Sequence, residues 1–275
     1  MRIKIRLLIL FFCCVCTNSL LAQKYQQSAE SVALGNTSFS GGLCVFSSKS
    51  CFSSTLAEIR LHHSNQFITS ELNSFSLDCR LPIPSLTTSI GISTFGYQHY
   101  RENKFSLALS KRLGQKVALG AITQLHTLHY TDCSEHYKKI IVGLDASFNI
   151  HNNDFIYTKF QHCFLLNDFS NIINTENNLF FIGIQSHASL SSSWILEVKT
   201  VNFQRPSIHL GFEYLVKHFA FRVGGYGLPI RPTYGLGFSK GRWTINVAAD
   251  WLINVGHSLC CDIQFKIGKI TNNKF

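Results

Sequence analysis

The chain has 275 residues, of which 45% are hydrophobic and only 15% charged, and its formal net charge is +10. Soluble domains average about 25% charged residues, so this composition argues against an ordinary soluble domain. The positive charge is spread out without a run of Lys or Arg, which gives no indication of nucleic-acid binding. A positive surface beside anionic lipid head groups is the milder interpretation.

Residues 1–22 have the features of a secretory signal peptide. Arg2, Lys4 and Arg6 precede a short apolar run over residues 7–16, which is the usual order of an export signal. Cleavage would remove three of the ten excess positive charges and leave a mature chain near +7. The alternative, an N-terminal membrane anchor, requires a spanning helix of about 20 apolar residues, and this run is shorter.

Residues 23–56 are rich in Ser and Gly and show no sustained alternation. We predict that they form either a periplasmic lead-in or a plug inside a barrel. Cys44 and Cys51 are close enough in sequence to form a disulfide in an oxidising compartment. The seven cysteines that follow residue 22 are odd in number and include no C-x-x-C pair. Neither a zinc site nor a disulfide framework is therefore indicated, and small, half-buried thiols are the simpler interpretation.

From residue 57 onward, apolar and polar residues alternate. The pattern is clearest in seven segments: 75–81, 104–113, 140–150, 193–199, 207–216, 242–251 and 258–267. Because successive side chains of a strand point to opposite faces, each segment has one apolar and one polar face. The segments are 7–11 residues long, and five of the seven fall within the roughly 9–11 residues of a tilted transmembrane strand. Strands of soluble proteins are usually about five or six residues long, which counts against a periplasmic sandwich.

We therefore predict that residues 57–275 form an all-β fold, a transmembrane antiparallel β-barrel of about 14 strands (12–14), with strands between Ala57 and Ile267. Turn-forming residues separate the strands at 113–115, 151–153, 177–178 and 240–241. Segments 155–163 and 179–187 carry apolar residues on both faces. This indicates that they pack against something inside the barrel.

The polar faces of the strands carry charges of both signs. The lumen-lining candidates are Asp78, Arg80, Arg112, Asp145, Glu197, Lys199, Glu213, Arg222, Arg242, Asp250, Asp262 and Lys266. The simpler interpretation of these residues is a lattice of charges that ties the wall together. The more specific interpretation is a selective polar path or a ligand groove. A lumen lined by charges of a single sign would indicate ion selectivity. These residues carry charges of both signs and give no such indication.

The three tryptophans, Trp194, Trp243 and Trp251, lie on apolar faces of predicted strands. Trp243 and Trp251 would be about 26 Å apart along one strand, or roughly 20 Å vertically after tilting. That spacing is near the ~25 Å between the aromatic girdles of a membrane barrel. We predict that the tryptophans are girdle residues; the alternative is the core of a soluble sandwich.

No catalytic or metal site emerges from the pattern. His257 and Ser258 are adjacent, so on a strand they point to opposite faces and cannot easily form a catalytic dyad. The same reasoning applies to two histidine pairs, His62 with His63 and His126 with His129. The sequence thus predicts no enzyme, no metal and no cofactor.

Several short pieces resemble one family of membrane barrels. Residues 31–36, Ser-Val-Ala-Leu-Gly-Asn, resemble the opening segment of FadL-like and PorV-like outer-membrane barrels. Residues 53–57, Ser-Ser-Thr-Leu-Ala, stand where that family has an Asn-Pro-Ala-Gly-Leu-Ala type motif, and lack its Asn-Pro and Gly. Residues 95–104 resemble a hairpin of the family, and residues 235–238, Gly-Leu-Gly-Phe, resemble its near-terminal strand.

The resemblance implies a fourteen-strand barrel in the bacterial outer membrane. Members of the family include channels for hydrophobic solutes and accessory proteins of a secretion system. We predict a passive channel or a FadL-like importer of small hydrophobic or amphipathic solutes. The alternative is a PorV-like, non-enzymatic accessory or scaffold protein of an envelope protein-secretion system. The candidate partners are outer-membrane lipid, a hydrophobic solute and secretion-system proteins. Nucleic acid is not a candidate partner.

Overall fold

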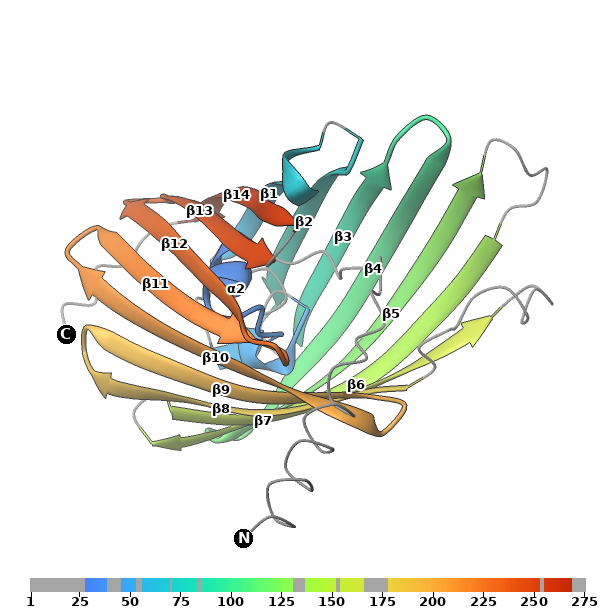
Figure 1. Ribbon diagram of the computed structural model, residues 1–275. Coiled ribbons are helices and arrows are strands. Elements are labelled where there is room, and N and C mark those ends of the chain that lie inside the picture. Colours follow the sequence, from blue (N-terminus) through green and yellow to red (C-terminus); the bar gives the residue numbers. More distant parts are fainter. Residues whose placement is uncertain are drawn as a thin grey trace, which may run out of the picture.

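The computed structural model is a closed antiparallel β-barrel of fourteen strands (Figure 1). It describes residues 28–38, 46–52, 56–69, 71–83, 86–130, 137–151, 154–165, 178–252 and 255–268; the predicted signal peptide lies outside them. β1 (Ala57–Asn65) pairs with β14 (Gly256–Ile267) and closes the ring. The predicted strand number and antiparallel barrel are confirmed, and the closed ring excludes the sandwich.

Every strand pairs with its neighbours in the sequence. The strands between β1 and β14 are β2 (Asn73–Ile83), β3 (Leu86–Gly96), β4 (Tyr100–Leu113), β5 (Val117–Tyr130), β6 (Tyr137–His151), β7 (Asp154–Leu165), β8 (Asn178–Ser189), β9 (Ser192–Val201), β10 (Gln204–Val216), β11 (Phe219–Tyr226), β12 (Arg231–Lys240) and β13 (Trp243–Leu252). They range from 8 residues in β11 to 15 in β6. Most are long enough to cross the hydrocarbon layer of a membrane at a tilt.

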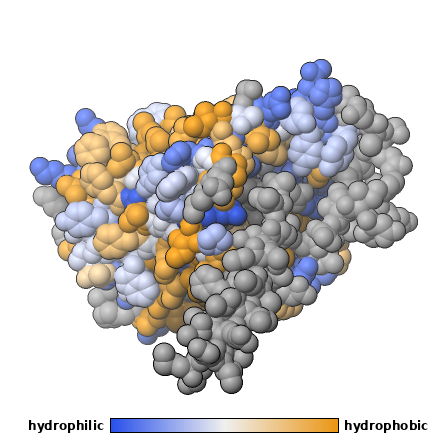
Figure 2. Space-filling model, in the orientation of Figure 1, coloured by the Kyte–Doolittle hydropathy of each residue, from blue (hydrophilic) through white to orange (hydrophobic). Residues whose placement is uncertain are grey.

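The alternation separates an apolar outer face from a polar inner face. In β4, Leu107 and Leu109 are exposed on the outside, whereas Ser106 and Ser110 are buried on the inside. The same holds around the ring, and Figure 2 shows apolar side chains spread over the outer surface. An apolar exterior with polar residues inside is the arrangement of membrane barrels, because lipid rather than water faces the wall.

The two ends of the barrel differ in their connections. Even-numbered strands are followed by short turns, as between Val216 and Phe219, and we name this side the short-turn end. Most odd-numbered strands are followed by longer connections, such as that between Leu165 and Asn178, and we name this side the long-loop end. Gly114 and Gly241 have φ of 69° and 62° at two short turns, where the sequence predicts turns. Bacterial outer-membrane barrels have short periplasmic turns and long extracellular loops.

Two pieces of the N-terminal segment lie within the ring of strands. The helix α2 (Ala29–Ala33) is next to β11–β14 (Figure 1), and the 3-10 turn η1 (Ser48–Phe52) is next to β3–β6. A third short piece, η2 (Gln66–Ile68), belongs to the β1–β2 connection. Within the described ranges, no helix is both long and apolar enough to span a membrane. The division of the chain after residue 56 stays a prediction.

Candidate functional site

Most of the predicted lumen-lining residues occupy inward positions of the strands: Asp78, Arg80, Asp145, Glu197, Lys199, Glu213, Arg222, Asp250, Asp262 and Lys266. Arg112 also has inward parity, because it pairs with the buried Ala118, whereas Arg242 lies outside the strands. Arg112 is exposed at the short-turn end, where its guanidinium donates to the carbonyls of Gly114 and Gln115 at 3.0 Å each. Arg242 is exposed and does not line the wall, because the turn between β12 and β13 consists of Gly241 and Arg242, one residue later than predicted.

Three of the inward carboxylates hold the backbone of the N-terminal segment. Asp262 accepts from the amide of Ala29 at 2.9 Å, and Asp145 accepts from the amide of Ser48 at 2.6 Å. Glu197 accepts from the amide of Ser38 at 2.9 Å and from its hydroxyl at 3.0 Å. Hydrogen bonds to charged groups are stronger than neutral ones and offset part of the cost of burying a carboxylate. The lattice of charges therefore also serves as an anchor for the segment inside it.

The anchor at α2 belongs to a longer chain of hydrogen bonds across the wall. Glu213 accepts from Arg222 at 2.6 Å, and Arg222 also donates to the side-chain oxygen of Asn246 at 2.8 Å. The amide nitrogen of Asn246 then donates to Asp262 at 2.7 Å. This chain links β10, β11, β13 and β14 to Ala29, so the sequence-predicted Glu213, Arg222 and Asp262 act as one network.

Glycines on neighbouring strands make room for the segment that follows α2. An added Cβ at Gly211 would lie 2.6 Å from the carbonyl oxygen of Leu34, and one at Gly235 would lie 2.6 Å from Cβ of Ala33. Gly224, which pairs with Gly211, faces the backbone of the same segment. The wall of β10–β12 is therefore free of side chains where the segment crosses it, and the two backbones approach closely.

The segment itself has the local signals for this path. Ser28 caps α2 by accepting from the amide of Ser31. Gly35 and Asn36 have φ of 75° and 62°, the left-handed conformation that commonly ends a helix. Thr233 then accepts from the amide of Gly35 at 3.0 Å and donates to the carbonyl of Ala33 at 3.1 Å. A polar hydroxyl on β12 thus fixes the turn after the helix.

η1 is held mainly by side chains near the short-turn end. The ring of Phe52 packs on Phe155 of β7 at 5.4 Å between centroids, and the guanidinium of Arg112 lies 5.0 Å from the Phe52 centroid. Lys49 donates to the side chain of Gln185 and lies 5.4 Å from the Phe155 ring. This contact explains the inward Phe155 of the two-faced segment 155–163, and the inward Tyr157 packs instead with Leu179 and Phe181.

Cys51 lies in the same turn as Phe52 and is a free thiol. Burial raises the pKa of this thiol, which keeps it protonated near neutral pH. Cys44, which is close enough in sequence to be its disulfide partner, lies outside the described residues.

Inward ion pairs on β1, β2, β4 and β5 complete the site. Glu58 on β1 pairs with Arg60 at 2.9 Å and with Arg80 on β2 at 3.2 Å. On β4 and β5, Glu102 lies 3.2 Å from a ring nitrogen of His126. The sequence analysis missed Glu102 because it began this strand at residue 104 instead of Tyr100. Glu58 and Arg60 lie within the predicted barrel but outside the segments in which the alternation is clearest, and applying the alternation to residues 57–65 would have found them.

The remaining predicted positions follow strand geometry. His62 and His126 are buried inside, whereas His129 is exposed, as the odd spacing predicts. The three tryptophans are exposed on the outer face, where Trp243 packs on Phe265 at 4.5 Å and Trp251 stacks on the exposed His257 at 6.0 Å. The girdle role of the tryptophans stays a prediction.

No protein-family model and no curated protein sequence matches this chain. Among solved structures it is similar to the toluene transporter TbuX of Ralstonia pickettii, with a TM-score of 0.63 and 10% identity over 88% of this chain and 98% of that one. It is also similar to a mutant of TodX, a monoaromatic hydrocarbon channel, with a TM-score of 0.63 and 8% identity over 87% and 98% of the two chains. CymD, another monoaromatic hydrocarbon channel, gives a TM-score of 0.61 and 9% identity over 88% and 97%.

At these identities the likeness establishes the fold alone. The chain has the closed barrel architecture of outer-membrane channels, and its neighbours bear the names of transporters and channels. The secretion-accessory alternative gains no support from them.

Proposed function

We propose that this protein is a passive channel of the bacterial outer membrane, and that it imports small hydrophobic or amphipathic solutes in the manner of the FadL-like channels. One observation carries the proposal: a closed barrel with an apolar exterior encloses an N-terminal segment that hydrogen-bonds to three inward carboxylates. In this proposal the lumen of the barrel is the pathway for the solute, and the anchored N-terminal segment is the element that controls passage through it.

The names of the structural neighbours indicate the class of solute. TbuX is a toluene transporter, and TodX and CymD are monoaromatic hydrocarbon channels. We therefore choose toluene as the first test solute. The mixed charge of the inner wall supports a path for uncharged or amphipathic molecules, since a wall of one sign would favour ions.

We further propose that residues 23–56 act as a luminal plug rather than as a periplasmic lead-in. The contacts of Ala29, Ser38 and Ser48 with Asp262, Glu197 and Asp145 support this proposal. Each contact joins residues far apart in the chain, so the segment restrains several strands at once. Weakening the contacts should open the lumen without opening the barrel.

The experiment measures toluene entry into liposomes and conductance in planar bilayers for the full chain. We expect toluene entry and low conductance for the wild type, and higher conductance for the triple variant Asp145→Asn, Glu197→Gln, Asp262→Asn. Glu102→Gln is the matched control, because Glu102 is also an inward carboxylate but pairs with His126 of the wall. Heat-modifiable gel mobility confirms that each barrel is folded.

An inserted, folded barrel that passes neither toluene nor ions, in the wild type and in the triple variant alike, would contradict the channel proposal. Equal conductance of the triple variant and the Glu102→Gln control would contradict the plug proposal while leaving the channel intact.

A further inference from the structure

The outer face of β4–β6 carries a small basic belt near the long-loop end. It consists of Arg101, Asn103, Thr127, His129 and Lys138, all at outward positions. Arg101 pairs with His129 across β4 and β5, Asn103 pairs with Thr127, and Thr127 pairs in turn with Lys138 on β6. Arg101 and Lys138 are exposed.

The described strand residues around Arg101 and Lys138 include no outward carboxylate. Among the described side chains at outward positions of β14 and β1–β6, none is Asp or Glu. Neither Arg101 nor Lys138 forms an ion pair within the described part of the chain. Two cations at outward positions of an apolar wall match an anionic ligand that lies in the plane of the membrane.

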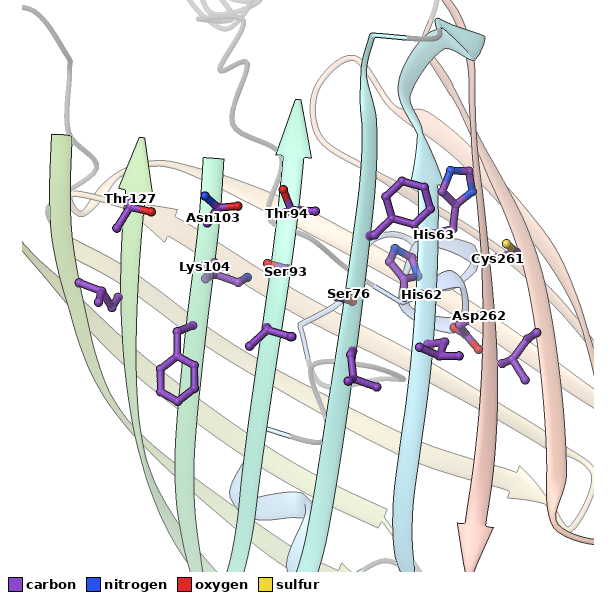
Figure 3. Close-up of a pocket in the computed structure, with 17 residues that line it drawn as sticks. His62, His63, Ser76, Ser93, Thr94, Asn103, Lys104, Thr127, Cys261 and Asp262 are labelled. Atoms are coloured by element: carbon purple, nitrogen blue, oxygen red, sulfur yellow. The ribbon is translucent and has the colours of Figure 1, made fainter. Parts of the chain in front are cut away.

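Directly beside the belt, the outer wall is hollowed. The cavity has a volume of about 660 Å³, and its floor is a row of apolar side chains: Leu61, Leu77, Ile92, Phe105, Leu125 and Ile263. Figure 3 shows Thr94, Asn103 and Thr127 side by side on β3, β4 and β5, above this row. Phe75, which pairs with Thr94, and Phe105, two residues after Asn103 on β4, are the two large rings of the lining. Such a volume is in the range of ligand cavities.

The belt lies at the level expected for lipid head groups. Tyr97 is exposed in the connection between β3 and β4, next to the strand end that carries Arg101, whereas Tyr100 and Tyr130 have inward positions. Tyrosines collect where a membrane meets water. The long-loop end of such barrels faces outward, so head groups at this level belong to the outer leaflet.

Arg101 and Lys138 are also spaced for one head group. They lie two strands apart and two residues apart along the strands, so their Cα atoms are about 12 Å from each other. Both side chains are long, and Arg and Lys bind phosphate oxygens through charge-assisted hydrogen bonds. The two cations can therefore reach phosphates of a single head group, with Asn103 and Thr127 as hydrogen-bond donors between them.

We propose that this face is a binding site for the phosphorylated glycolipid of the outer leaflet, the lipid A part of lipopolysaccharide. Its phosphates bind Arg101 and Lys138, and an acyl chain fills the hollow over Ile92 and Phe105. The site rests on the outer-membrane location proposed above and is independent of what the lumen transports.

The first experiment measures retained lipid by native mass spectrometry of the full-length barrel, with diphosphorylated lipid A as the probe. We expect the double variant Arg101→Gln, Lys138→Gln to retain about tenfold less lipid A than the wild type. The control is Lys111→Gln, Lys240→Gln, which removes two outward cations near the short-turn end. Equal losses in the two double variants would overturn the site.

The second experiment fills the hollow. Thr94→Trp places a large ring in it, whereas Thr88→Trp places the same ring outward on the same strand, away from it. We expect only Thr94→Trp to reduce retention of lipid A. Retention that is unchanged by Thr94→Trp would overturn the role of the hollow.

Two further outcomes separate the possible failures. If phosphatidylglycerol is retained as well as lipid A, the assignment to the outer-leaflet glycolipid is wrong. If the protein does not insert into a bilayer and shows no heat-modifiable mobility, the proposed membrane location fails together with the site. A folded channel that loses no lipid in any variant overturns the site alone.

Discussion

The two pieces of the N-terminal segment are held in different ways. The piece around α2 lies close to the backbone of β10–β14, where glycines and alanines leave room and hydrogen bonds join main chain to wall. The piece around η1 is held mostly by long or aromatic side chains near the short-turn end, and only one carboxylate, Asp145, contacts its main chain. Close backbone approach tolerates no added atom, whereas long side chains can adjust. We therefore expect the α2 piece to be the fixed part of the segment and η1 the part that releases first.

The largest expected effect comes from adding a side chain to the wall under α2. Gly211→Val places a Cβ 2.6 Å from the carbonyl oxygen of Leu34, which cannot move away without breaking the contacts of Gly35 with Thr233. Overpacking of this kind costs about 1–3 kcal/mol. We expect displacement of residues 28–38, measured as rapid proteolysis of the N-terminal segment in a folded barrel.

The control for this prediction is Gly225→Val. Gly225 lies on β11 beside the same region, but its Cβ would meet the side chain of Ile230 rather than the segment. Valine is well suited to a strand in either position. Equal protease resistance of the two variants would mean that the glycines of β10–β12 do not form the seat of α2.

A smaller effect on hydrogen exchange should distinguish two of the three anchoring carboxylates, Asp262 and Asp145. Asp262 accepts from two obligatory donors, the amide of Ala29 and the side-chain nitrogen of Asn246. Asn246 cannot reverse its amide, because its oxygen accepts from Arg222. In Asp262→Asn a single amide oxygen must replace two acceptors, so one donor is left unpaired. In Asp145→Asn the remaining oxygen can still accept from Ser48.

We expect Asp262→Asn to accelerate hydrogen exchange at Ala29 by about tenfold, the effect of losing one hydrogen bond to a charged group. Asp145→Asn should change exchange at Ser48 by much less. Exchange measured on peptides covering residues 28–38 and 46–52 tests both. A larger effect at η1 than at α2 would reverse the proposed order of stability.

The sequence specifies the barrel well because alternation is a local property. Ser106 and Leu107 point to opposite faces whatever the register of β4, so the face of each strand residue follows from the pattern alone. Contacts across the lumen are different. Ala29 and Asp262 are 233 positions apart, and nothing local indicates that they meet.

Glycines illustrate the same limit. Gly211 reads in the sequence as one of the small residues between apolar neighbours, yet its role is to clear a path for Leu34. The available signal was the presence of glycine at inward positions of three consecutive strands, at Gly211, Gly224 and Gly235. Strand ends are the other weak point: Arg242 falls in a turn because Gly241 reverses the chain one residue later than the alternation suggests.

The smallest expected effect concerns the side-chain contacts of η1. Arg112 is exposed and lies over the ring of Phe52, a contact worth about 0.5–1 kcal/mol at such a site. Its loss in Arg112→Ala should loosen η1 without displacing α2. Cys51 reports on this change, because burial raises its pKa and so lowers the fraction of reactive thiolate at neutral pH. When η1 is released, the thiol gains solvent and its pKa falls back toward the ordinary value.

We therefore expect iodoacetamide at pH 8 to alkylate Cys51 about two- to fivefold faster in Arg112→Ala than in the wild type, the rate ratio that corresponds to a contact of this strength. Peptide-resolved mass spectrometry separates Cys51 from the barrel thiols, and Cys261 on the outer face of β14 is the internal standard. Gly211→Val should leave the Cys51 rate nearly unchanged if the two pieces are held independently. Equal acceleration of Cys51 by Arg112→Ala and by Gly211→Val would instead show that the N-terminal segment moves as one body, and the distinction between a fixed α2 and a releasable η1 would be wrong.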